Sequence, residues 1–184
     1  MERDYKDLTN LKEVLEKARQ LDETALAILT KEYYPIIFRY FYYRTKTRED
    51  AEDLTGEVFV RVVNAIKSQK GNFVAWLFRI AKNLLIDYYR KRAKLKETSL
   101  DQMAIEPLPG SYKYERDTLH PEDIKKMLNL LTDEQKEVIT LKFLEDYPNR
   151  EIAQIMNKSV GAVKALQFRA LSALRDILKK EGEM

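Results

Sequence analysis

Basic side chains gather in two segments of this sequence, and the first of them also carries aromatic residues. Between Trp76 and Lys96 there are seven basic residues and one acidic residue, Asp87, for a net charge of +6. Tyr88 and Tyr89 lie in the same run. Because cations bind phosphates and aromatic rings stack on unpaired bases, this combination is typical of a surface for single-stranded nucleic acid. The alternative is a solvated helix end, where lysine and arginine favour the helix dipole.

The second basic segment runs from residue 149 to residue 180, with seven basic and two acidic residues and a net charge of +5. Its sequence NREIAQIMNKSVGAVKALQFRALSAL has the pattern of a helix-turn-helix. Ala153 is small enough to let a second helix cross closely, and Asn157 suits a sharp turn because asparagine tolerates left-handed backbone. Ser159 can cap the helix that follows.

The second helix of this motif has two distinct faces. We expect its inner face to consist of Val160, Val163, Leu166 and Leu171. We expect its outer face to present Lys164, Gln167, Phe168 and Arg169. A basic second helix held against a first is how such motifs enter the major groove of DNA, although any two packed amphipathic helices produce a similar stripe.

The segment REDAEDLTGEVFVRVVNAI predicts an amphipathic helix with an acidic outer face. Its inward positions are Leu54, Val58, Val62, Ala65 and Ile66, and its outward positions are Glu52, Asp53, Glu57 and Arg61. A face of this kind is either solvated surface or a contact for a protein partner.

The residue types exclude most catalytic and metal chemistry. The chain has no cysteine and one histidine, His120, which rules out a disulfide framework, a cysteine zinc site and a histidine metal cluster. A nuclease needs clustered acids to hold a metal, and the acids here lie on interrupted surface faces. We therefore predict no catalytic residue, no metal, no cofactor and no enzymatic activity.

The elements that position these segments are predicted to be helices throughout. Five glycines and five prolines occur in 184 residues, and apolar residues recur at three- and four-residue steps. We expect helices near residues 10–20, 23–43, 48–66, 72–93, 133–144, 149–156 and 160–180. Asp22 can cap the second helix, Pro35 should kink or divide it, and Gly71 with Asn72 should break the chain before the fourth. Thr132 and Gln135 form a capping box.

A stretch rich in proline separates two groups of helices. It holds Pro107, Pro109 and Pro121, and residues 97–123 carry seven acidic and two basic side chains, a net charge of −5. We predict an all-α protein with a domain at 1–96, a flexible acidic linker at 97–122 and a helix-turn-helix domain at 123–184. The composition is 45% apolar and 34% charged, with no membrane-length apolar run or signal core, so we expect a cytoplasmic globular protein.

Taken in order, the three segments resemble the sigma-70 family of RNA polymerase sigma factors, and specifically its extracytoplasmic-function (ECF) group. REDAEDLTGEVFVRVVNAI is similar to region 2.2, the helix that grips the β′ clamp helices of the polymerase. FVAWLFRIAKNLLIDYYRKR is similar to regions 2.3 and 2.4, which melt and read the −10 promoter element. LTDEQKEVITLKFLEDYPNREIAQIMNKSVGAVKALQFRALSALRDIL is similar to region 4, which binds the −35 element and the β-flap.

This resemblance implies a transcription initiation factor with core RNA polymerase and promoter DNA, duplex and single-stranded, as partners. The polymerase contact would be Asp53, Glu57 and Arg61. The −10 contact would be Trp76, Arg79, Lys82, Asn83 and Arg90, with Asn83 in a loop that captures a flipped base. The −35 contact would be Lys164, Gln167, Phe168 and Arg169. An anti-sigma factor is a further partner that the resemblance allows, and the linker would thread toward the polymerase active site.

Two features depart from the family pattern. Gly56 replaces a common glutamine in region 2.2, at a cost of about 1 kcal/mol relative to alanine. Ala165 and Leu166 replace a serine and an arginine, which puts the family's usual −35 preference in doubt. The alternative function is a dimeric helix-turn-helix repressor, which would bind palindromic duplex without polymerase.

Overall fold

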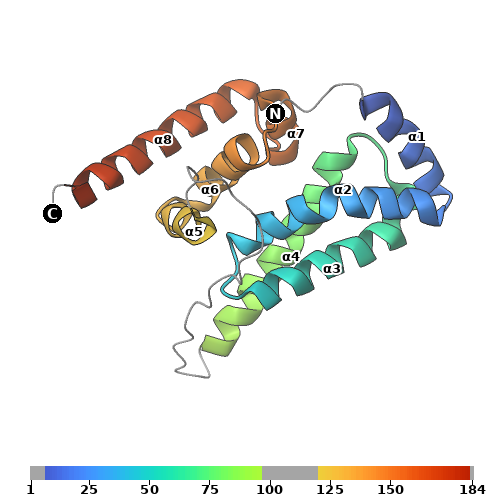
Figure 1. The fold of residues 1–184 in the computed structure, drawn as a ribbon, viewed down its shortest axis with the longest axis horizontal. Helices are drawn as coiled ribbons and strands as arrows, with labels where there is room; N and C mark the ends of the chain where they lie inside the picture. The colour runs from blue at the N-terminus through green and yellow to red at the C-terminus, as the bar shows by residue number, and fades with distance from the viewer. Residues whose placement is uncertain (1–6, 97–119, 183–184) are drawn as a thin grey trace. The chain divides into compact units, whose positions relative to one another are not determined.

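The structure is a computed structural model that describes residues 7–96 and 120–182, in two compact units. The first unit spans Met1–Ala104 and the second spans Ile105–Met184. Every regular element in the described parts of both units is helical (Figure 1). The predicted all-α fold is therefore confirmed for the described residues.

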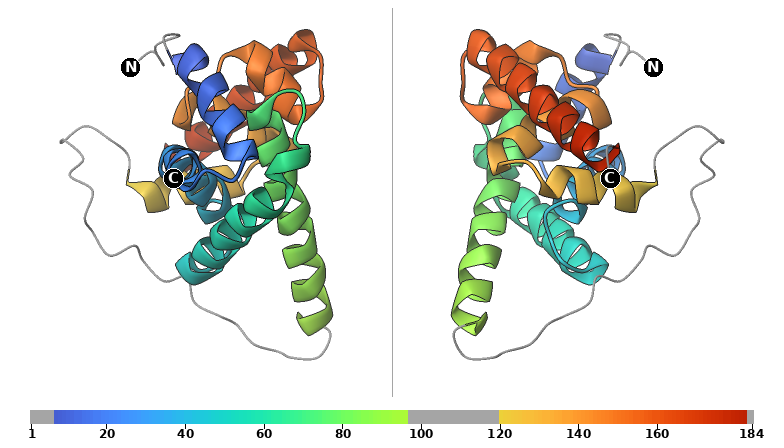
Figure 2. Two further views of the ribbon diagram at one scale, coloured as in Figure 1. Left: turned by 90° about the vertical axis from the view of Figure 1, so that its right-hand side faces the viewer. Right: turned by 90° about the vertical axis from the view of Figure 1, so that its left-hand side faces the viewer.

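The first unit is built around its second and third helices. Its elements are α1 (Asp7–Arg19), α2 (Glu23–Tyr42), α3 (Arg48–Ala65), the short 3₁₀ turn η1 (Ile66–Ser68) and α4 (Phe73–Lys96). α3 packs against both α2 and α4, and α1 packs against α2 (Figure 1). Toward the C-terminal end of α4, α3 and α4 diverge (Figure 2).

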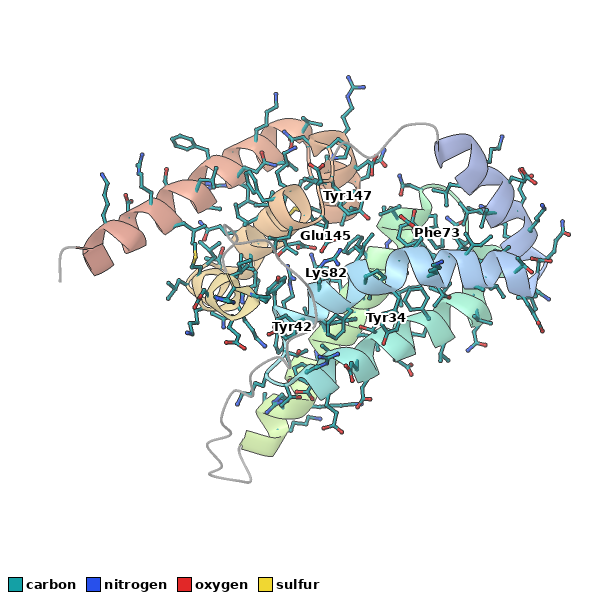
Figure 3. The ribbon with its side chains drawn as sticks, viewed as in Figure 1. Tyr34, Tyr42, Phe73, Lys82, Glu145 and Tyr147 are labelled. Atoms are coloured by element: carbon teal, nitrogen blue, oxygen red, sulfur yellow. The ribbon has the colours of Figure 1, made fainter. Side chains whose placement is uncertain are left out.

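Aromatic pairs fill the core of the first unit. The buried Tyr33 packs edge-on against Phe73 with 5.3 Å between ring centroids, and Tyr34, which is 37% exposed, stacks on Phe59 at 5.8 Å at the edge of the core. Phe73 and Tyr34 are labelled in Figure 3. Tyr40 on α2 is buried and meets Phe78 on α4 edge-on at 5.4 Å. Such edge-on and offset pairs add to the stability gained from apolar burial. Two of the three pairs join α2 to α4, and the Tyr34–Phe59 pair joins α2 to α3.

Side-chain caps set the ends of the helices in this unit. Asp22 accepts a hydrogen bond from the Ala25 amide at 2.8 Å, as predicted. Gly71 has a φ of 76°, and Asn72 accepts from the Ala75 amide at 2.8 Å, which confirms the predicted break before α4. Pro35 lies inside α2, which runs unbroken from Glu23 to Tyr42, so the expected division of this helix is not found.

The second unit contains the helix-turn-helix. Its elements are α5 (Pro121–Asn129), α6 (Asp133–Ile139), the π-helical turn η2 (Thr140–Leu144), α7 (Asn149–Met156) and α8 (Val160–Gly182). α8 packs against α6 and α7. Thr132 and Gln135 form the predicted capping box, with N···O distances of 3.1 and 3.4 Å. The span predicted as one helix at 133–144 ends instead in the π turn.

α5 was not predicted from the sequence. Pro121 stands at its first position, and Glu122 and Asp123 follow in its first turn. Proline is favoured at a helix start and acidic residues favour the positive end of the helix dipole. The last two positions of the expected 97–122 linker therefore begin a helix, while residues 97–119 lie outside the described residues.

Candidate nucleic-acid and partner interfaces

The turn between α7 and α8 has the geometry that the sequence predicted. Asn157 adopts the left-handed conformation, with φ 52° and ψ 49°. The Lys158 amide donates to the Ala153 carbonyl at 2.9 Å, which closes the end of α7. Ser159 accepts from the Ala162 amide at 3.1 Å and starts α8. The turn thus fixes where α8 begins relative to α7.

The inner face of α8 differs from the prediction at two positions. Val163 and Leu166 are buried as expected, and Ala170 joins them. Val160 and Leu171 were expected inside but are 37% and 46% exposed, so the inner stripe is narrower than predicted.

The outer face of α8 presents an aromatic ring between two cations. Phe168 is 72% exposed, and Lys164 and Arg169 are exposed on either side of it along the helix. Gly161 and Ala165, both exposed and small, precede Phe168 on the same face, so a surface could approach the backbone closely. Gln167 is half-buried and donates to Asn149 Oδ1 at 2.8 Å, which ties α8 to the start of α7.

The outer face of α4 carries a row of polar and cationic side chains. Arg79, Asn83, Ile86 and Arg90 are all exposed at spacings of four, three and four residues, which place them in line on one side of a helix. Lys82 is exposed on one flank of this row. Trp76 is half-buried at the N-terminal end, with its ring 5.8 Å from that of Phe73. The predicted residues of this face thus lie on a single helix.

The resemblance implied that Asn83 lies in a loop, but the structure places it in a helix. It lies in the middle of α4, which runs unbroken from Phe73 to Lys96. Leu84 and Leu85 are buried directly after it, so the apolar stripe continues through this position and keeps the chain helical. Its amide is presented from a rigid helix rather than from a turn.

Arg92 belongs to the same basic run but points away from the outer row of α4, and its side chain is only 25% exposed. Its guanidinium donates to Asp50 Oδ2 at 3.1 Å and to the Tyr88 hydroxyl at 2.6 Å. Tyr88 donates to the same Asp50 oxygen at 2.9 Å. Burial opposes ionisation of Asp50, but its hydrogen bonds with Thr47 and Tyr88 and the charge of Arg92 outweigh that effect and lower its pKa.

A groove of about 280 Å³ separates α3 from the C-terminal half of α4. Its floor includes Leu54, Leu84 and Tyr88, and its rim includes Arg61, Arg90 and Lys91. The rim cations are partly neutralised, because Arg61 pairs with Glu57 at 2.9 Å and Arg90 with Asp87 at 3.7 Å.

The outer face of α3 combines acids with exposed apolar side chains. Asp53, Glu57 and Arg61 are exposed as predicted. Val60 and Val63, which the sequence analysis did not single out, are 56% and 42% exposed on the same helix. Both were visible in the sequence as apolar residues out of phase with the buried stripe of Val58, Val62 and Ile66. Val60 and Val63 are three residues apart, so they lie near one another on the exposed side of α3.

Neither a metal centre nor a membrane helix is found over residues 7–96 and 120–182. No three histidine, aspartate or glutamate side chains in these ranges come together to hold a metal ion. None of the helices in these ranges is long and apolar enough to cross a membrane.

Comparison with known proteins identifies a family match for both units. Residues 29–95 match the family model for sigma-70 region 2, and residues 122–174 match the model for sigma-70 region 4. The chain is 34% identical over 183 residues to the ECF RNA polymerase sigma factor BldN of Streptomyces coelicolor, covering 96% of this chain and 69% of that one. It is 30% identical over 181 residues to the ECF RNA polymerase sigma factor SigW of Bacillus subtilis, covering 92% and 97%.

Solved structures share the fold. The sigma factor RpoE of Bartonella quintana, in complex with the anti-sigma factor NepR, has a TM-score of 0.66 and 26% identity, covering 82% of this chain and 96% of that one. CnrH, in complex with the cytosolic domain of CnrY, has a TM-score of 0.70 at 22% identity, covering 91% and 96%. The second likeness concerns the fold alone.

Proposed function

This chain belongs to the ECF group of the sigma-70 family of RNA polymerase sigma factors. On that premise we propose that three of its surfaces each bind a different part of the initiation complex. The protein is a transcription initiation factor that directs RNA polymerase to promoters. The outer face of α3 binds the polymerase, the outer face of α4 binds the −10 element, and the outer face of α8 binds the −35 element.

The polymerase contact is assigned to Asp53, Glu57 and Arg61 around the exposed Val60. Exposed apolar surface at the centre and charges at the rim are the usual anatomy of a protein interface. The Arg61–Glu57 pair at 2.9 Å holds both side chains along the helix, which leaves Val60 uncovered. The partner surface is the β′ clamp helices of the polymerase.

The −10 contact is assigned to Trp76, Arg79, Lys82, Asn83 and Arg90. The main support for this assignment is the row of exposed polar and cationic side chains along α4. Its cations suit phosphates that follow one strand, and the Asn83 amide has two donors and one acceptor for the edge of an unpaired base. Because Asn83 lies on a rigid helix, its amide would hold a base flipped out of the duplex at a fixed position. Binding of this base stabilises the melted bubble.

The −35 contact is assigned to Lys164, Phe168 and Arg169, with Gln167 at its edge. An apolar ring between two cations suits a major groove, where phosphates flank base edges and thymine methyl groups. The bond from Gln167 to Asn149 supports a positioning role for Gln167 beside any contact with DNA.

The remaining assignments follow from the family. Residues 1–96 make the polymerase and −10 contacts, residues 123–184 make the −35 and β-flap contacts, and 97–122 link them. The chain catalyses nothing itself and acts in the cytoplasm. An anti-sigma factor is a further proposed partner, since RpoE was solved with one. The repressor alternative loses its support, because a family match to both regions does not favour it.

Two pairs of variants test the assignment of the DNA contacts. Changing Arg79 and Arg90 to alanine should weaken binding of the holoenzyme to fork-junction DNA with a single-stranded −10 region, without changing the affinity of the chain for a −35 duplex. Changing Lys164 and Arg169 to alanine should do the reverse. If both pairs weaken both DNAs equally, the surfaces are not divided as proposed.

A further inference from the structure

A hydrogen-bonded cluster joins the C-terminal half of α4 to the turn before α3. Thr47 and Asp50 form a reciprocal capping box at the start of α3, with N···O distances of 3.1 and 3.3 Å. The Tyr88 hydroxyl donates to Asp50 Oδ2 at 2.9 Å and accepts from the Lys46 amide at 3.4 Å. Arg92 donates to both Asp50 and Tyr88. Asp50 therefore links the start of α3 to the C-terminal half of α4 through side chains.

A second link fastens the same part of α4 to the same turn. The hydroxyl of Tyr89, the residue after Tyr88, donates to the Arg44 carbonyl at 2.8 Å. Two successive tyrosines thus reach the 44–47 turn from one turn of α4. A helix end that solvent alone surrounds would have no such fixed direction.

Arg92 differs from the neighbouring cation Arg90 in how much solvent reaches it. The Arg92 side chain is 25% exposed and its partner Asp50 is 27% exposed. The Arg90 side chain is 75% exposed and lies 3.7 Å from Asp87. The charge of Arg92 is consequently neutralised and directed away from the outer face of α4.

We propose that Asp50 is a positioning residue for −10 recognition: it withholds Arg92 from the nucleic acid and fixes the direction of the cationic end of α4. This inference rests on the proposed role of α4. Withholding one arginine lowers affinity for any strand alike, because phosphate contacts carry no sequence information. A fixed direction of the helix end keeps Asn83 and Arg90 aligned with a single path of the bound DNA strand. This alignment favours binding of the correct base sequence.

The proposal predicts two changes of opposite sign when Asp50 is neutralised. Asp50→Asn keeps the shape and a capping oxygen but removes the charge that neutralises Arg92, which should make Arg92 available to a phosphate. One more phosphate contact to a single strand should steepen the slope of log K against log salt by about 0.7. Preference for the best sequence over random strands should fall on the order of fivefold, the low end of one base contact. A purely structural role would weaken binding without steepening the slope.

The experiment uses holoenzyme reconstituted from core RNA polymerase and the full chain. The probe is fork-junction DNA whose single-stranded −10 region is randomised, read by sequencing, and the salt slope is measured on the enriched sequence. Glu49→Gln is the matched control, because Glu49 is exposed on the same turn of α3 and its change alters net charge equally. It should leave the slope and the enrichment unchanged.

Arg92 provides a second test that does not depend on the folding of the Asp50 variant. Arg92→Ala alone should leave the salt slope unchanged while lowering the sequence enrichment. Combined with Asp50→Asn, it should return the steepened slope to the value of the parent. Tyr88→Phe, which keeps the ring and the Arg92–Asp50 pair, should lower the enrichment without changing the slope.

The outcomes separate this inference from the proposed function. Arg79 is exposed and has no ion pair among residues 7–96, so Arg79→Ala should make the slope shallower if α4 binds the strand. If Arg79→Ala changes nothing, the role of α4 is wrong. If Arg79→Ala acts but Asp50→Asn leaves the slope unchanged, or Arg92→Ala alone makes it shallower, Asp50 does not withhold Arg92 and the inference is overturned.

Discussion

Replacing Val60 by alanine should weaken polymerase binding without destabilising the chain. The change removes two methyl groups, each worth about 0.8 kcal/mol when it is fully buried. Val60 is 56% exposed in the structure, so the interface can bury about that fraction of the two groups. The expected loss of binding free energy is therefore about 0.9 kcal/mol, which corresponds to a four- to fivefold higher Kd.

The stability of the isolated chain provides the control within the same variant. Alanine has the higher helix propensity and Val60 packs little against the core, so the melting temperature should stay the same or rise. Ile28→Ala on α2, at a position that is 48% exposed, removes a similar apolar group away from α3. It should leave polymerase affinity unchanged.

The assay is competition between parent and variant chains for core RNA polymerase at equilibrium. Changing Asp53 and Glu57 to alanine should add a further loss, of about 0.2–1 kcal/mol for each charge that pairs across the rim. Parental affinity in both the Val60 variant and the double variant would refute the assignment of this face. Equal losses in the Val60 and Ile28 variants would refute it as well.

Three further predictions concern single side chains. Arg169→Ala should relax base preference in the −35 element by about 1–3 kcal/mol at one position. Lys164→Ala should instead lower affinity for all sequences and flatten the salt dependence of binding. Titration of duplex variants measures both effects. Asn83→Ala should lower discrimination among the four bases at one position of a single-stranded −10 region by about 1–3 kcal/mol, and an equal loss for all four would contradict base readout. Because the pKa of Asp50 is lowered, its ionised form stabilises the fold at pH values above the ordinary carboxyl pKa of about 4, and this contribution is lost as the pH falls below that value. Thermal unfolding of the parent and Asp50→Asn should therefore differ most at neutral pH and converge at acidic pH, and a constant difference would contradict it.

Local signals in the sequence predicted most of the second unit. Ser159, Asn157 and Thr132 act through bonds to residues three or four positions away, so their roles can be read from short segments. The same kind of signal was present for α5, where Pro121 precedes two acidic residues, but it was read as part of a linker. The Thr47–Asp50 capping box was also visible as T-x-x-D and was missed.

Contacts between distant residues could not be predicted in the same way. Asp50 and Arg92 are 42 positions apart, and nothing in one sequence pairs them. The sequence does indicate on which side of α4 Arg92 lies. Leu85, Tyr88 and Arg92 follow one another at three- and four-residue steps, so they share one side of the helix. Charge alone groups Arg92 with the other cations of the basic run, whereas its helical phase places it beside Tyr88 on the inner side of α4.

In vitro transcription with purified components tests the central claim most directly. Core RNA polymerase is incubated with a library of randomised promoter templates, with and without the full chain, and the 5′ ends of the transcripts are sequenced. We predict that the chain causes initiation at a defined subset of templates that share one −35 and one −10 sequence at a fixed spacing. Initiation at the same templates with and without the chain would contradict its role as a sigma factor.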